Sequence, residues 1–190
     1  DEAIGEASFR AGDQGAIEIK GLEKFVGEGK HQLKIKYKGC NVALPYTVNV
    51  TYNIALPPSS EACDVDLQTA LSVNQCRVGD MVRMNIQVQN LRDTAKPSTT
   101  AIIGIPAGLS LQMNTLKALQ EQRSIAYFEI WENNLVLYFR QLRADEKIQI
   151  PIDLKAEIPG NFEAAASNIF LYYTAENKYW ESGEAIRISK

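Results

Sequence analysis

The sequence has very few of the side chains that build metal and catalytic sites. It contains one histidine, His31, and three cysteines, Cys40, Cys63 and Cys76, among 190 residues. A structural zinc site takes about four Cys or His ligands, and no CxxC pair is present. The sequence also lacks a Gly-x-Ser-x-Gly elbow and a glycine-rich phosphate loop. We therefore expect a protein that is not an enzyme and holds no metal or cofactor, with His31 exposed at a turn.

Long apolar runs and an excess of positive charge are missing as well. No stretch approaches the roughly 20 apolar residues that span a bilayer, so we expect no membrane insertion. The formal net charge is −3, and such a chain has no broad basic field for a nucleic acid. The first residues do not resemble a signal peptide, and we interpret the chain as beginning inside a longer parent protein.

What the sequence does have is a period-two alternation of apolar and polar residues, which is typical of strands with one buried face. The clearest case is 82–88, where Val82, Met84, Ile86 and Val88 alternate with polar residues. Short turn-forming segments separate such stretches, which favours an all-β fold, an antiparallel β-sandwich. Further strands are expected at 33–37, 46–52, 101–105, 126–130, 135–141, 148–154, 169–174 and 184–188.

One short helix is predicted at 115–122. Leu116 and Leu119 fall on one face of it, and Lys117 points away from them. Asn114 or Thr115 is expected to cap its first amides. A single short helix is compatible with an all-β domain that carries one crossing element.

A Pro/Ser-rich segment divides the chain. Residues 57–62 lack alternation and are interpreted as a linker. Residues 1–56 hold about four predicted strands, which are too few for an independent core. Residues 63–190 hold enough strands for a complete sandwich. We expect the first part either to pack on other parts of the protein or to expose apolar surface.

Two covalent features are left open by the residues themselves. Cys63 and Cys76 flank a strand-like stretch, and they either form a disulfide in an oxidising compartment or pack as buried thiols. Asn49, followed by Val50 and Thr51, matches a glycosylation sequon, although it lies within a predicted strand.

Several short segments, taken in order, carry a family resemblance. They are 21–24 (GLEK), 29–33 (GKHQL), 44–48 (LPYTV), 59–63 (SSEAC), 103–110 (IGIPAGLS), 151–160 (PIDLKAEIPG) and 171–174 (LYYT). The later segments resemble the receptor-binding domain of α2-macroglobulins and related thioester-containing proteins. The earlier ones are similar to the second half of the CUB-like domain of that family. The resemblance thus makes 1–56 a partial CUB-like domain and 63–190 a receptor-binding domain.

The resemblance implies a part of a protease inhibitor or opsonin of innate immunity, secreted or, in a bacterium, periplasmic. In such proteins a protease cuts a bait region, a buried thioester is exposed, and the C-terminal domain becomes available for recognition. The implied partners are the rest of the parent chain, target proteases and a cell-surface receptor. This chain has no Cys-Gly-Glu-Gln thioester motif and no candidate bait region. The extracytoplasmic setting favours a Cys63–Cys76 disulfide, with Cys40 left as a free thiol.

The resemblance also points to receptor-binding residues. The animal domain presents two lysines one helical turn apart; Lys117 matches the second, and Met113 occupies the first position. Lys117 and Met113 are therefore the candidate receptor-binding residues. The alternative is a structural domain that packs on the thioester domain and communicates its state, with no receptor of its own.

Overall fold

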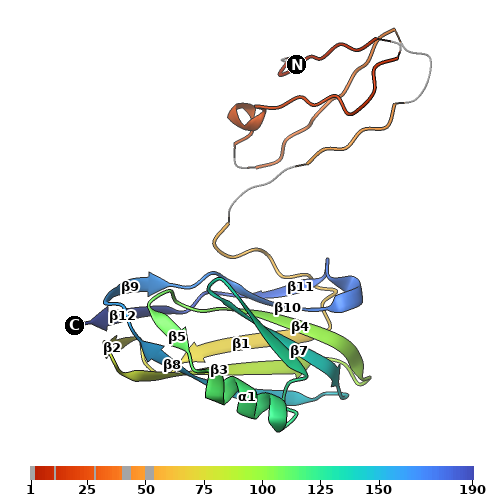
Figure 1. The fold of residues 1–190 in the computed structure, drawn as a ribbon. Coiled ribbons are helices and arrows are strands. Elements are labelled where there is room, and N and C mark those ends of the chain that lie inside the picture. The colour runs from red at the N-terminus through yellow and green to blue at the C-terminus, as the bar shows by residue number, and fades with distance from the viewer. Residues whose placement is uncertain (1–2, 11, 28, 40–43, 50–53) are drawn as a thin grey trace. The chain divides into compact units, whose positions relative to one another are not determined.

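The computed structural model describes residues 3–10, 12–27, 29–39, 44–49 and 54–190, and the chain divides into two compact units, residues 1–50 and 51–190. Apart from one 3-10 turn, η1 (Glu23–Phe25), the helices and strands of the described residues belong to the second unit (Figure 1). In order they are β1 (Val65–Leu71), β2 (Gln75–Arg77), β3 (Met81–Asn90), β4 (Lys96–Gly104), β5 (Leu109–Leu111), α1 (Met113–Glu121), β6 (Tyr127–Trp131), β7 (Asn134–Leu142), β8 (Lys147–Ala156), β9 (Gly160–Glu163), β10 (Ser167–Leu171), η2 (Tyr172–Thr174), β11 (Lys178–Glu181) and β12 (Ala185–Ser189).

Two antiparallel sheets form a sandwich in the second unit. One has the strand order β1-β3-β8-β5, and the other has the order β11-β10-β4-β7-β6. Their facing sides share one core, in which Met84 and Ile152 of the first sheet and Leu137 and Ile169 of the second have no exposed surface. The alternation in the sequence decides which side chains point inward, and the predicted sandwich is confirmed.

A third, smaller sheet was not expected. It has the order β2-β12-β9, and its β2–β12 pair is parallel. The strands β2 and β9 have three and four residues, which is too short for alternation to separate them from loops.

The helix α1 lies against β8 of the first sheet and against β6, the edge strand of the second. It buries Leu116 and Leu119, as predicted, but it begins at Met113 rather than at Thr115. The expected side-chain cap by Asn114 or Thr115 is wrong, because Gln112 takes the N-cap position and makes no side-chain cap. Main-chain bonds fix this end instead: the amide of Gln112 donates to the Asp153 carbonyl of β8 at 3.2 Å.

The first unit does not show the predicted strands in its described residues. The alternating side chains Leu33, Ile35 and Tyr37 are 46%, 50% and 52% exposed, and no strand forms at 33–39 or 44–49. Residues 50–52, the rest of the predicted strand at 46–52, lie outside the described residues. Alternation leads to a strand only when a partner strand can pair with the segment and a second layer can cover its apolar face. This unit buries none of its described residues, so its alternating side chains have no such layer.

The predicted Cys63–Cys76 disulfide is not formed: both residues are free thiols. Twelve residues lie between them, and seven of these form β1, an extended strand that spans about 20 Å. A disulfide needs Cα atoms within about 7 Å of each other. Cys63 is instead buried beside β1, where its thiol donates to the Val65 carbonyl at 3.3 Å. Cys40 lies outside the described residues.

We expect the two thiols to react at different rates. Burial raises the pKa of Cys63, and burial together with Asp80 raises the pKa of Cys76, so both are protonated at neutral pH. Cys76 is half-buried and Cys63 is buried, so a maleimide should label Cys76 first in the folded protein. Peptide mapping after timed labelling measures this. Non-reducing mass spectrometry that showed a linked Cys63–Cys76 peptide would contradict the structure.

Candidate functional site

The exposed face of α1 is where the structure places the predicted recognition residues. Met113 and Lys117 are four residues apart on this helix, so their side chains are neighbours on one face. Lys117 is exposed and Met113 is 43% exposed. The structure therefore places both residues on α1 and exposes them to solvent.

The helix that carries Lys117 is held at both ends. At its C-terminus the backbone amide of Arg123 donates to the backbone carbonyl of Gln120 at 3.0 Å. The backbone amide of Ser124 donates to the backbone carbonyl of Leu119 at 2.9 Å. These two bonds make a Schellman cap, in which Arg123 adopts φ 61° at the position where glycine is usual. Lys117 forms no ion pair with a carboxylate in the described part of the chain. Its ammonium is therefore available on a rigid element.

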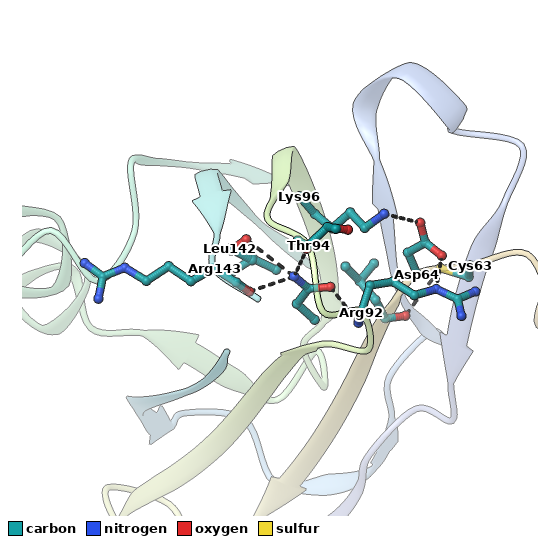
Figure 2. Close-up of polar contacts among 9 residues, drawn as sticks. Cys63, Asp64, Arg92, Thr94, Lys96, Leu142 and Arg143 are labelled. Atoms are coloured by element: carbon teal, nitrogen blue, oxygen red, sulfur yellow. Dashed lines mark hydrogen bonds and ion pairs between the residues drawn. The ribbon is translucent and has the colours of Figure 1, made fainter. Parts of the chain in front are cut away.

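A buried side-chain amide connects two loops of the sandwich, and Figure 2 shows three residues that it contacts, Thr94, Leu142 and Arg143. Asn90, at the end of β3, has no exposed surface, and its Nδ2 donates to the carbonyls of Thr94 at 2.8 Å, Arg143 at 2.7 Å and Leu142 at 3.5 Å. Its Oδ1 accepts the Arg92 amide at 3.0 Å. One side chain thus joins the β3–β4 loop to the β7–β8 turn.

An ion-pair cluster lies next to this amide. The Asp64 carboxylate accepts from Arg92 Nε at 2.6 Å and from Lys96 Nζ at 2.7 Å. These two cations lower the pKa of Asp64 below its usual value. No local pattern in the sequence indicates this cluster or the role of Asn90, because the participating residues come from separate segments of the chain.

A second group of charged residues joins β1 to the β11–β12 connection. The Glu184 carboxylate accepts from Thr69 Oγ1 at 3.2 Å and from the Leu71 amide at 3.3 Å. Burial, together with Asp66 and Glu184, raises the pKa of Glu181. Because both oxygens of Glu184 are bound to β1, we assign this group a structural role.

Two further predicted residues, Asn49 and His31, belong to the first unit. Asn49 is exposed, while Val50 and Thr51 of its sequon lie outside the described residues. His31 is exposed and its Nε2 lies 2.8 Å from the Gly27 carbonyl. Within the described ranges, no three or more His, Cys, Asp or Glu side chains are placed to hold a metal ion. In the same ranges, no helix is long and apolar enough to cross a membrane.

One family model matches part of the chain. Residues 96–182 match the model of the A-macroglobulin receptor binding domain. Trypsin-activated α2-macroglobulin from Escherichia coli is similar in structure over 70% of this chain and 11% of its own, with a TM-score of 0.57 and 14% identity. Native α2-macroglobulin from the same organism, from domain MG7 to the C-terminus, is similar in structure over 70% of this chain and 25% of its own. The TM-score is 0.54 and the sequence identity is 16%. No curated protein sequence matches.

Proposed function

Because residues 96–182 match the model of the A-macroglobulin receptor binding domain, we propose that this chain is the non-catalytic recognition module of a macroglobulin-type protease inhibitor or opsonin. In this proposal the module becomes accessible after a protease cleaves the parent. The chain spans 11% and 25% of the two Escherichia coli chains it matches, so the inhibitory activity itself belongs to a larger protein.

The observation that carries the proposal is the position of Lys117. The matched residues 96–182 include the whole of α1, and α1 holds this lysine in solvent without a carboxylate partner among the described residues. A lysine ammonium presented in this way suits a receptor pocket lined by carboxylates. Met113, one turn earlier, offers a thioether instead of a second ammonium.

We expect Lys117→Ala to weaken binding to an immobilised lipoprotein-type receptor ectodomain by about tenfold or more, because the docking charge is removed. Met113→Lys should strengthen binding, since it restores a second ammonium one turn away. Lys117 is exposed, so its replacement should change the free energy of unfolding by less than about 0.5 kcal/mol. Surface plasmon resonance and urea unfolding measure the two effects.

Lys155→Ala is the matched control, because Lys155 is an exposed lysine on β8 rather than on α1. It should leave receptor binding unchanged. If the wild type, Lys117→Ala and Met113→Lys gave the same response, α1 would not be the recognition element. Absence of binding by a labelled chain to any host cell would favour the alternative, a structural domain that packs on the thioester domain.

A further inference from the structure

A groove opens beside the C-terminal end of α1, on a surface separate from Met113 and Lys117. Its volume is about 870 Å³, and it lies between the segment that joins α1 to β6 and the C-terminal part of β7 with the turn that follows. A volume of this size is within the range of known ligand sites. The groove is large enough to accept several residues of another chain.

Three arginines line this groove: Arg123, Arg140 and Arg143. All three are exposed, and none forms an ion pair with a carboxylate among the residues that the structure describes. The lining carboxylate is Glu146, whose Oε2 accepts the backbone amide of Arg143 at 2.6 Å. The partial negative charge at a helix C-terminus stabilises a nearby cation, which explains one arginine at this position but not three. The groove therefore carries a net positive charge in a chain whose net charge is negative.

The backbone positions of these arginines are fixed. Arg143 donates its amide to Glu146, and its carbonyl accepts from the buried Asn90. Figure 2 shows the Arg143 side chain extending away from the Asp64 ion pairs. Arg123 occupies the left-handed position of the Schellman cap, a conformation that glycine adopts more easily. An arginine with a left-handed backbone is higher in conformational energy than a glycine would be. We therefore look for a role of the Arg123 side chain.

The groove also has an apolar floor and an uncovered sheet edge. Ile125 and Phe139 line it and are almost fully buried. Phe139 and Gln141 pair with β4 on one side. The pairing of β6 with β7 ends at Tyr138, so in the described residues no strand pairs with 139–141 on the other side. An extended peptide can use such an edge through its main chain.

We propose that this groove binds an acidic, extended protein segment, whose carboxylates pair with Arg123, Arg140 and Arg143 while its main chain lies along β7. The apolar floor and the free main-chain edge favour a peptide over a sulfated polysaccharide, which has neither apolar side chains nor amides to pair with a strand. This inference deepens the proposed function by adding a second contact surface, and it rests on that function only in taking a protein as the partner.

The test uses the whole 190-residue chain and a fluorescein-labelled peptide of alternating aspartate and valine, with an asparagine–valine peptide as the uncharged comparison. We expect the acidic peptide to bind in a fluorescence anisotropy titration and its affinity to fall as salt is added. The asparagine peptide should bind at least about tenfold more weakly. A heparin oligosaccharide is titrated in parallel.

Arginine variants locate the binding surface. Each of Arg123→Gln, Arg140→Gln and Arg143→Gln should weaken the acidic peptide by about twofold to fivefold, and the triple variant by more than about tenfold. Arg187→Gln, which removes the same charge from β12 in the small sheet, should change the affinity by less than about twofold. Arg123→Gly should weaken binding while its thermal midpoint stays equal or rises, because glycine suits the left-handed position.

The inference is overturned if the acidic and neutral peptides bind equally, or if the triple variant behaves like Arg187→Gln. It is also overturned if the heparin oligosaccharide binds through these arginines and the acidic peptide does not. These outcomes do not depend on Lys117 or on a lipoprotein-type receptor. The groove and the proposed receptor surface can therefore fail separately.

Discussion

Replacing Asn90 with alanine is expected to destabilise the second unit by about 2–4 kcal/mol. The change removes a fully buried amide and leaves the carbonyls of Thr94, Leu142 and Arg143 without their shared donor. Asn90→Asp keeps the shape but places a carboxylate among these carbonyls, so it should cost at least as much. Urea unfolding followed by tryptophan fluorescence measures both variants.

Asn85→Ala is the control for this experiment, because Asn85 lies on the same strand with its side chain exposed. It should change the free energy of unfolding by less than about 0.5 kcal/mol. If Asn90→Ala and Asn85→Ala were equally stable, the Asn90 hydrogen bonds would not be holding the β3–β4 loop to the β7–β8 turn.

The second large effect is expected when the chain is expressed in two pieces. Residues 57–190 should unfold in one cooperative transition with a urea m-value close to that of the full chain, because m follows the surface exposed on unfolding. Residues 1–56 alone should show no cooperative transition. The described residues of the first unit bury no side chain, so no apolar burial offsets the loss of conformational entropy.

The larger piece begins at residue 57 rather than at 63 because residues 59 and 60 contact the sandwich. The Ser60 amide donates to the Lys178 carbonyl at 2.8 Å, and the Trp180 amide donates to Ser59 Oγ at 2.8 Å. The segment before Cys63 therefore lines the free edge of β11. A piece beginning at 63 should be less stable than one beginning at 57. Cooperative unfolding of 1–56 alone would show that this part holds a core of its own.

The sandwich itself was predictable because its strands are long enough for alternation to be visible. Val82, Met84, Ile86 and Val88 are buried as their spacing indicates. The helix was predictable because Leu116 and Leu119 are three residues apart and flanked by polar residues. Its first residue was not, because a main-chain bond from Gln112 to β8 decides where the helix starts.

The predicted disulfide shows where sequence reasoning reaches its limit. Two cysteines with twelve residues between them can be near or far in space, depending on whether the intervening chain turns or stays extended. Here the chain between Cys63 and Cys76 includes the seven extended residues of β1. The first unit gives a related lesson, since Leu33, Ile35 and Tyr37 alternate but have no second layer against which to pack.

By itself, the sequence determined that residues 63–190 form an all-β sandwich with one helix, and it pointed to the macroglobulin family and to Lys117 as an exposed residue. These features depend on local periodicity and on ordered segments. Only the tertiary structure decided that Asn90 joins two loops, that Asp64 is paired with Arg92 and Lys96, and that three arginines line one groove. The physical reason is that each of these arrangements unites residues from separate strands, and strand order and register are set by the packing of the whole core.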